Sequence, residues 1–549
     1  MMRWFALAVT LALAGAVNPA RAQHEMHHGG AAGTVPAIAR VGHVHHVVGT
    51  RNPAAQAAFD EGLALCFAFN HDEAVRAFQR AFALDSTLAM AQWGIAYASG
   101  PNINLPMDDD HARAAWAALQ KAQALEPNAP ARDRAYIDAL AKRYSDDPRA
   151  DRGALDQAWA SAAGALAAGD PNDVDAAALH AEALLTVHPW HWWTLDGKPT
   201  EGVADAIAEL ERALLIAPGH IGLDHFYIHA LEESPHPERA LPAAHRLEAM
   251  AGLQAGHLVH MPSHIYENVG EHVHSALVNE KAVAVDRKYI TENHVMGVYP
   301  VMYYTHNMHF AMFSHMNAGN CARALKWAGQ ARDNALQYVK MMPMVEVFAG
   351  MPLWVQVRFH RWADVLKTPD PGGGMPISRV TWHFARAMAY ASTGDPALAQ
   401  SELDAYRAAI PAVKPELWFG YNPPPVLFGV GDQQLQGAIA GARGDRAGAI
   451  AHWREAVAAE DTLQYDDPPE WLLDSRPGLG AVLLADGRFA DAEQVFRDDL
   501  ERHPNTGRAL YGLMESLRGQ GRAADANKLE PRFRAAWKNA DTRLSVANL

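Results

Sequence analysis

The sequence predicts an all-α fold, a solenoid in which helical hairpins stack side by side as an α–α superhelix. Three observations support this prediction. From Asn52 onward, alanines and large apolar residues recur at spacings of three and four, the period of an amphipathic helix. A glycine-led turn motif recurs along the second half of the chain. Hydrophobic residues make up 49% of the 549 residues, which is enough to build a packed core.

The turn motif defines a repeat. Gly487-Arg-Phe-Ala-Asp-Ala492 recurs as Gly521-Arg-Ala-Ala-Asp-Ala526, 34 residues later, which is the tetratricopeptide (TPR) period. Related turns start at Gly319, His360, Gly394 and Gly444. His360 and Gly394 are again 34 residues apart, and the other spacings, of 41, 50 and 43 residues, correspond to that period with loop insertions. Glycine takes the left-handed turn between two helices, and the small alanines let those helices pack closely. Because such hairpins stack to bury their faces, they leave a concave groove that suits a small-molecule or peptide substrate, or a protein partner.

The N-terminal half shows weaker copies of the same unit. Residues 59–85 form one predicted hairpin that turns near Asn70, and Trp93-Gly94-x-x-Tyr97 is typical of the start of the next. The two cysteines, Cys66 and Cys321, lie in alanine-rich helical stretches, so we expect buried free thiols and no disulfide framework.

The first 22 residues have the pattern of a signal peptide. Arg3 precedes an apolar run of 14 residues, and Ala20-Arg21-Ala22 is a cleavage site of the A-x-A type. No later stretch is apolar enough to span a membrane, so we expect a periplasmic or secreted protein. The predicted domains are a signal peptide (1–22), a flexible His/Met-rich segment (23–50), N-terminal helical repeats (51–170), His-rich central repeats with a metal site (171–345) and C-terminal TPR repeats (346–549).

Charge and histidine content narrow the function. The net charge of −15 opposes binding to a phosphate backbone, which excludes nucleic acid as a partner. Of the 29 histidines, 17 fall between His180 and His315. Their spacings are helical, as in His225-Phe-Tyr-Ile-His229, which places two imidazoles one turn apart on one face. In His257-Leu-Val-His260-Met-Pro-Ser-His264, Pro262 is expected to break or start a helix.

Imidazoles packed together repel when charged and leave unpaired nitrogens when neutral, so a transition metal is the simplest way to accommodate them. The absence of cysteine from this region excludes cysteine-ligated zinc and iron–sulfur clusters, and Phe226 excludes the zincin motif. A dinuclear copper centre with three imidazoles per ion is the leading interpretation. Its predicted ligands are His225, His229, His257, His260, His264 and His306.

Mixed ligation with Glu182 or Glu232 would instead suit iron, manganese or zinc. The same two glutamates are candidate general bases, and Tyr266 is a candidate hydrogen-bond or proton donor. An aromatic run at residues 188–193 either walls the site or caps the edge of a repeat. Methionines at helical spacing between Met302 and Met316 are interpreted as core filler.

Several of these stretches resemble one protein group. Asp224-His-Phe-Tyr-Ile-His-Ala230, Gly256-His-Leu-Val-His-Met-Pro-Ser-His-Ile-Tyr266 and His306-Asn307 are similar to the tetratricopeptide repeat protein 38-like group and its secreted bacterial relatives. The resemblance covers roughly residues 50–540. It implies the helical-repeat fold and no particular reaction.

Three functions remain open at this point. The first is a copper-dependent oxidoreductase that activates dioxygen or a small substrate at an open coordination position. The second is a metal-dependent hydrolase, with Glu232 or Glu182 as general base. The third is a module without enzymatic activity, either a scaffold for a protein partner or a copper-handling protein.

Overall fold

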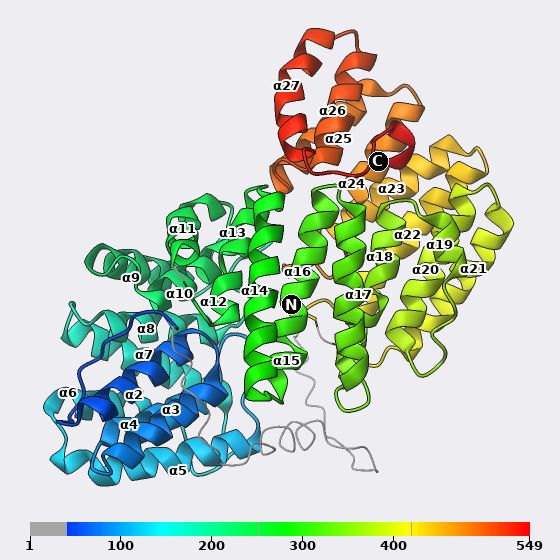
Figure 1. Ribbon diagram of the computed structural model, residues 1–549. Coiled ribbons are helices and arrows are strands. Elements are labelled where there is room, and N and C mark those ends of the chain that lie inside the picture. The colour runs from blue at the N-terminus through cyan, green and yellow to red at the C-terminus, as the bar shows by residue number, and fades with distance from the viewer. Residues whose placement is uncertain (1–40, 251, 419) are drawn as a thin grey trace, which may run out of the picture.

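A computed structural model describes residues 41–250, 252–418 and 420–549. Within these residues the predicted all-α solenoid is confirmed: helices follow one another as antiparallel hairpins, and no strand forms beyond two isolated bridges (Figure 1). No described helix is long and apolar enough to cross a bilayer. The predicted signal peptide lies outside the described residues.

The N-terminal repeats consist of α2 (Pro53–Phe67), α3 (His71–Leu84), α4 (Ala89–Ala98), α5 (Asp109–Leu125), α6 (Ala131–Leu140), α7 (Arg152–Gly169) and α8 (Val174–Val187). The predicted first hairpin is α2 with α3, and its turn is at Phe69, whose φ of 52° is left-handed. Both free cysteines are buried, as predicted.

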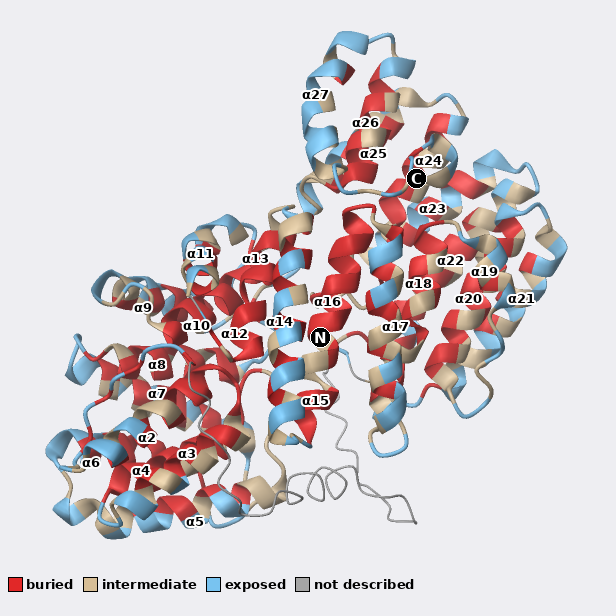
Figure 2. Cartoon of the chain, viewed as in Figure 1, coloured by how far each residue is buried: buried red, intermediate tan, exposed pale blue. Residues whose placement is uncertain are grey.

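The central repeats consist of α9 (Val203–Ile216), α10 (Ile221–Glu232), α11 (Leu241–Ala249), α12 (Gly256–His260), α13 (Pro262–Asn268), α14 (His272–Asn293), α15 (Val298–Val301), α16 (Tyr303–Asn317) and α17 (Cys321–Tyr338). As predicted, Pro262 starts a helix, α13. Figure 2 shows that α10, α12 and α16 are buried almost throughout, whereas the outer helices expose one face. Met308, Met312 and Met316 lie in the core, which agrees with their interpretation as filler.

The C-terminal repeats consist of α18 (Met351–Arg358), α19 (Trp362–Lys367), α20 (Pro376–Ser392), α21 (Pro396–Ala409), α22 (Pro424–Ala442), α23 (Arg446–Glu460), α24 (Ser475–Ala485), α25 (Phe489–Arg502), α26 (Gly507–Gly519) and α27 (Ala523–Ala536). Short 3₁₀ helices lie at Glu126–Asn128, Pro237–Ala240, Pro343–Gly350, Ile410–Ala412, Pro415–Leu417 and Val546–Asn548.

All six predicted turns separate two helices. Each has a left-handed φ, between 52° and 87°, at the first residue of its motif: Gly319, His360, Gly394, Gly444, Gly487 and Gly521. The left-handed region is freely open to glycine, which explains its position at five of the six turns.

Two segments outside the regular hairpins help to position the centre of the molecule. Residues 41–50, which we expected to be flexible, pack on the N-terminal repeats through Val41, Val44, Val48 and the buried His46, while residues 23–40 lie outside the described residues. The loop between α23 and α24 reaches back to the central repeats, where the Tyr465 hydroxyl lies 3.0 Å from Asn268 Nδ2. The array therefore curls so that its C-terminal part covers residues far away in sequence.

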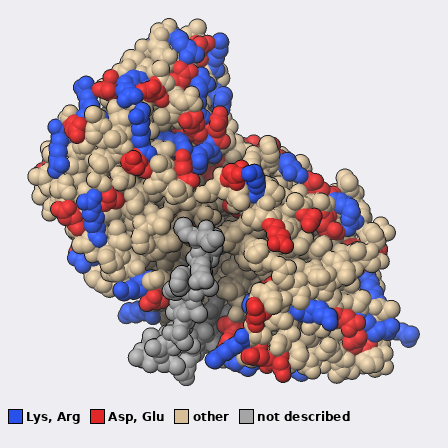
Figure 3. Space-filling view, turned by 180° about the vertical axis from the view of Figure 1, so that it is seen from behind, with Lys and Arg blue, Asp and Glu red and all other residues tan. Residues whose placement is uncertain are grey.

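The surface carries charges of both signs. On the face shown in Figure 3, lysines and arginines are interspersed with aspartates and glutamates and form no continuous basic stripe.

Candidate metal centre

The six predicted ligands lie together in the buried interior. Helix α10 carries His225 and His229, α12 and α13 carry His257, His260 and His264, and α16 carries His306. They form two groups of three: His225, His229 and His257 in group A, and His260, His264 and His306 in group B. Within each group one nitrogen from every residue lies within 4.8 Å of the others. We refer to the two groups together as the six-histidine centre.

The imidazoles approach one another through their Nε2 atoms. In group A, His225 Nε2 and His257 Nε2 are 3.0 Å apart. In group B, His260 Nε2 lies 2.9 Å from His264 Nε2 and 3.2 Å from His306 Nε2. Each group therefore presents nitrogen atoms toward a common point, which is the arrangement that a metal ion with imidazole ligands requires.

The two groups are neighbours. The ring centroids of His229 and His264 are 5.7 Å apart, and those of His257 and His260 are 5.9 Å apart. Because each of these pairs joins a residue of group A to one of group B, the six rings form one continuous cluster and not two separate sites.

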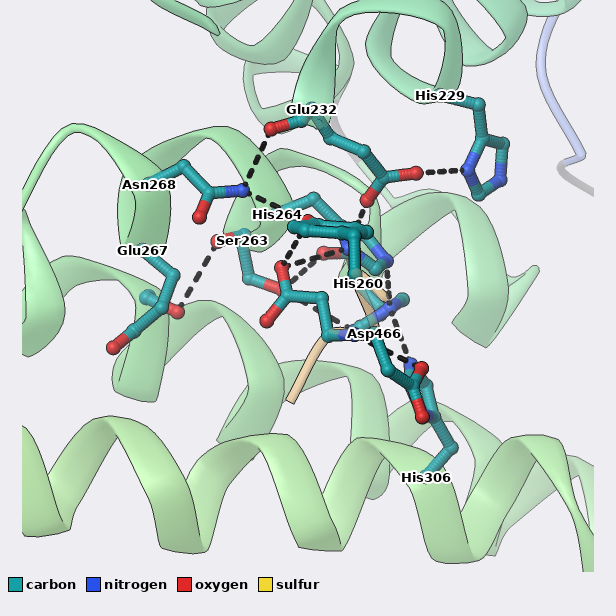
Figure 4. A network of polar contacts seen from close by, with 12 residues as sticks. His229, Glu232, His260, Ser263, His264, Glu267, Asn268, His306 and Asp466 are labelled. Carbon is teal, nitrogen blue, oxygen red and sulfur yellow. Dashed lines mark hydrogen bonds and ion pairs between the residues drawn. The ribbon is translucent and has the colours of Figure 1, made fainter. Parts of the chain in front are cut away.

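A second layer of residues holds the opposite ring nitrogens. His225 Nδ1 lies 2.7 Å from the Phe67 carbonyl oxygen, and His260 Nδ1 lies 2.6 Å from Asn279 Oδ1. Glu232 extends from α10 to both groups, with Oε1 2.6 Å from His229 Nδ1 and Oε2 2.5 Å from His264 Nδ1 (Figure 4). Such acceptors on the outer nitrogen are typical of metal-binding histidines, because they fix the tautomer and the ring orientation.

These acceptors determine which nitrogen carries the proton. Asn279 Nδ2 donates to the Ser275 carbonyl, so the amide oxygen faces His260, and a carboxylate at His264 Nδ1 also accepts. Both Nδ1 atoms are then protonated, and a neutral His260 and a neutral His264 point their Nε2 lone pairs at each other across 2.9 Å. Two lone pairs at this distance repel unless a cation or a proton lies between them.

Burial keeps most of these rings neutral. It lowers the pKa of His225, His257, His260 and His306 well below the ordinary value, and it also lowers that of His229. A neutral imidazole is the form that binds a metal. For a metal-free chain, burial also acts on His264, but the carboxylates of Glu232 and Asp467 outweigh it and raise its pKa to about 10.

Each group is covered by a phenylalanine. The Phe69 ring centroid lies 4.5 Å from that of His225 and 5.2 Å from that of His257. Phe310 covers group B in the same way, 5.0 Å from His260 and 4.9 Å from His264. From the aromatic run at residues 188–193, Trp190 lies 5.7 Å from His229, which favours the interpretation as a wall of the site.

The three predicted acid–base residues have different positions. Glu232 lies within the centre. Glu182 does not: it lies beside Arg143, at 3.9 Å, and Thr186, at 3.0 Å, in the N-terminal repeats. Tyr266 also lies outside, because it follows His264 by two residues and so projects from the other side of α13, where its hydroxyl donates to Glu248.

Sequence reasoning missed several residues of the second layer. Asp467, on the loop between α23 and α24, places Oδ2 3.2 Å from His264 Nδ1 although 203 residues separate them. Asn279, Phe69 and Phe310 were not predicted either. Of these, only Phe310 had a local signal, since it stands one helical turn after His306.

Two other groups of residues have spacings that suit a metal ion. Glu232, His264 and Asp467 form one, which uses the outer nitrogen of His264. His46, Asp173 and Asp175 form the other, in the N-terminal repeats.

No protein-family model matches the chain. No curated protein matches it either. One similar solved structure is a human IFIT1 dimer with m7Gppp-AAAA, which is 12% identical over 89% of this chain and 91% of that chain, with a TM-score of 0.33. The APC/C hetero-tetramer Cut9-Hcn1 is 13% identical over 90% of this chain and 74% of that chain, with a TM-score of 0.30. Yeast Tom70 is 10% identical over 90% of this chain and 93% of that chain, with a TM-score of 0.27. At these TM-scores the similarity is distant, and it gives no information about the six-histidine centre.

Proposed function

We propose that this chain holds a dinuclear copper centre and acts as an oxidoreductase that activates dioxygen. The observation that carries the proposal is the division of six histidines, five buried and His306 half-buried, into two adjoining groups of three whose Nε2 atoms meet inside the centre. Within the six, every donor is an imidazole. Imidazole suits copper, whereas iron, manganese and magnesium sites in proteins usually include carboxylate ligands.

A copper pair, when bound, supplies dioxygen binding and electron transfer. The protein's own residues supply orientation and shielding. Glu232, Asn279 and the Phe67 carbonyl hold the outer ring nitrogens, so the inner nitrogens keep their lone pairs available. Phe69 and Phe310 keep water away from the two groups. Glu232 holds protons at the Nδ1 atoms of His229 and His264 and thereby couples the two groups.

A metal-dependent hydrolase is the second candidate. It is favoured by the group of Glu232, His264 and Asp467, whose two carboxylates and one nitrogen suit zinc, manganese or iron. Glu232 cannot serve both designs at once, because a metal ion at its Oε2 would displace the contact with His264 Nδ1. The identity of the bound metal therefore separates the two functions.

The remaining expectations extend the proposal. We propose that the protein is exported to the periplasm or secreted, that it belongs with the tetratricopeptide repeat protein 38-like group, and that its groove receives a small-molecule or peptide substrate. A copper-handling protein would bind copper without catalytic turnover. A scaffold would bind a protein partner without catalytic turnover.

Elemental analysis of protein purified without a metal-affinity tag tests the proposal. We expect about two copper ions per chain, bound after anaerobic loading with Cu(I), and an absorption change on exposure to dioxygen. His229→Ala and His260→Ala each remove a ligand from one group and lower the copper content. His452→Ala is the matched control, since His452 bonds Gln433 far from the centre. One equivalent of zinc in place of copper would favour the hydrolase, and a chain that binds no metal would exclude both enzymes.

A further inference from the structure

Three tyrosine rings lead away from group A in an unbroken line of contacts. Tyr303, at the start of α16, packs edge-on to His257 with ring centroids 5.2 Å apart. Tyr299, on α15, stacks on Tyr303 at 5.4 Å, and Tyr289, on α14, packs edge-on to Tyr299 at 5.5 Å. Every step in the line is a direct contact between aromatic rings, so no gap interrupts it between the centre and Tyr289.

The two outer tyrosines each have a carboxylate in place to accept a proton. The Tyr299 hydroxyl donates to Asp286 Oδ1 at 2.8 Å, and the Tyr289 hydroxyl donates to Glu73 Oε1 at 2.9 Å. Asp286 is only 1% exposed, and its other oxygen accepts from Asn307 Nδ2. The groups that face it are thus a phenol and an amide, so the buried carboxylate has no cation to neutralise it and is well suited to take up a proton.

We propose that Tyr303, Tyr299 and Tyr289 form a relay that carries oxidising equivalents out of the metal centre when dioxygen reacts in the absence of substrate. The inference rests on the proposed function, because the oxidant is the copper pair after its reaction with dioxygen. Its role is to protect the histidine ligands, which are the nearest oxidisable groups, from damage.

Electrons and protons balance along the relay. One electron leaves Tyr299 for the oxidised metal pair through the Tyr303 ring, and the Tyr299 hydroxyl proton moves to Asp286. Tyr289 then gives one electron to Tyr299, which recovers its proton from Asp286, while the Tyr289 proton moves to Glu73. A one-electron reductant in solution, such as ascorbate, finally reduces Tyr289, and the proton returns from Glu73. The net change is one electron passed from the reductant to the metal pair.

The outer end of the line is linked to the surface through an ion pair. Tyr289 is 7% exposed, as is Tyr299, but Glu73, which accepts from the Tyr289 hydroxyl, is paired at 2.7 Å with Arg76, whose side chain is 37% exposed. A small reductant at the surface beside this pair therefore delivers its electron to Tyr289 without entering the buried centre.

The test uses the full-length, copper-loaded and reduced protein, mixed with dioxygen without substrate. We expect a tyrosyl radical by electron paramagnetic resonance, and Tyr299→Phe abolishes the part of it that resides on the outer tyrosines. Oxidation of the ligand histidines, measured by mass spectrometry of peptides, then rises several-fold. Asp286→Asn removes the proton acceptor, keeps the tyrosines and has the same effect. Tyr136→Phe is the matched control, since Tyr136 also donates to a carboxylate, Asp173, but lies off the line.

The outcomes separate the relay from the proposed function. Equal copper content with equal histidine oxidation in the wild type, Tyr299→Phe and Tyr289→Phe would overturn the relay and leave the copper centre standing. Absence of copper binding would remove the oxidant and overturn both. Tyr289→Phe lies at the outer end of the line, so it tests the relay even where a change at Tyr299, in the middle of the line, disturbs folding.

Discussion

Two buried clusters of histidine in this molecule look alike in composition but differ in how their charges and lone pairs are matched. One is the six-histidine centre. The other, which we call the His46 cluster, consists of His46, Asp173, Asp175 and His220 in the N-terminal half. Both bring together residues from separate repeats, and both have the spacing of a metal site.

In the His46 cluster the chain supplies its own partners. Asp175 lies 2.8 Å from His46 Nδ1 and 3.0 Å from His220 Nε2, while Asp173 accepts from Arg132 and from the Tyr136 hydroxyl, both at 2.9 Å. Although His46 Nε2 lacks a partner, the carboxylates are matched by hydrogen-bond donors. A metal ion bound to Asp173 would have to displace the guanidinium of Arg132, which already pairs with that carboxylate.

In the six-histidine centre the inner nitrogens meet only one another. The comparison shows that burial and proximity of histidines are weak evidence for a metal. The stronger evidence is a pair of rings, such as His260 and His264, whose outer nitrogens are held by acceptors and whose inner nitrogens face each other at 2.9 Å. By this criterion the six-histidine centre is the better candidate for the proposed metal, and we interpret the His46 cluster as structural.

The largest predicted difference between the clusters is the effect of metal. Copper at a thousandfold excess over its Kd stabilises the folded chain by about 4 kcal/mol for each ion bound, because the ions bind the folded centre and not the unfolded chain. Thermal unfolding of metal-free and copper-loaded protein measures this, and His260→Ala abolishes most of the gain. Copper stabilisation that survives in His260→Ala but disappears in Asp173→Asn would place the metal in the His46 cluster and reverse the comparison.

The second prediction concerns His46→Ala. We expect it to lower the free energy of unfolding by about 3 kcal/mol, because it breaks a buried pair and leaves Asp175 with one partner fewer. The copper content stays at the wild-type value. Urea unfolding and elemental analysis of the same preparation measure both quantities. A loss of copper in this variant would mean that the two clusters are not independent.

The sequence was sufficient for those parts that depend on local pattern. The repeat turns follow from glycine and alanine spacing, and the ligands on α10 follow from a four-residue spacing on one helix face. Even across Pro262, three histidines within eight residues were enough to single out the candidate ligands of α12 and α13, which the structure brings together with the others. The regular stacking of a solenoid allowed histidines of neighbouring repeats to converge on one pocket, but the sequence left open whether all six meet.

What the sequence could not supply depends on long-range folding. Asp467 reaches His264 only because the loop after α23 folds back over the central repeats. Tyr266 was assigned to the site from its nearness in sequence, whereas the helix turns it toward Glu248. Glu182 was chosen as a carboxylate near histidines, but its partner is Arg143, in another repeat. His46 lay in the His/Met-rich segment that was expected to be flexible, so nothing local indicated its burial.

The third prediction tests the residue that links the C-terminal repeats to the centre. Asp467→Asn keeps the shape of the side chain but removes the negative charge 3.2 Å from His264 Nδ1. Loss of such an outer partner weakens metal binding about 10- to 100-fold. Competition with a copper chelator measures the change. Asp466→Asn, at the neighbouring position, is the control, since Asp466 Oδ1 accepts from the Asp467 backbone N–H, a bond that asparagine keeps, and Asp466 forms no hydrogen bond or ion pair with any of the six described histidines. Unchanged affinity in Asp467→Asn would show that Glu232 alone orients His264.

The smallest predicted effect is a difference in pH dependence between the clusters. Burial lowers the pKa of His257, so in metal-free protein the folded chain binds fewer protons than the unfolded chain as pH falls below about 6.5. Stability contributed by this neutral imidazole is present above pH 6.5 and is lost below it, by at most about 1.4 kcal/mol per pH unit.

Asp175, in the His46 cluster, behaves differently. Although burial raises its pKa, the bonds to His220 and His46 lower the pKa below the ordinary value, so the stability that Asp175 contributes is lost only below about pH 4. Urea unfolding of metal-free protein at pH 6.5 and 5.5 separates the two, because His257→Gln reduces the loss of stability over this interval while Asp175→Asn leaves it unchanged. Equal slopes in wild type and His257→Gln would mean that His257 takes up its proton as readily in the folded chain as in the unfolded one, and the argument that burial keeps this ring neutral would then fail.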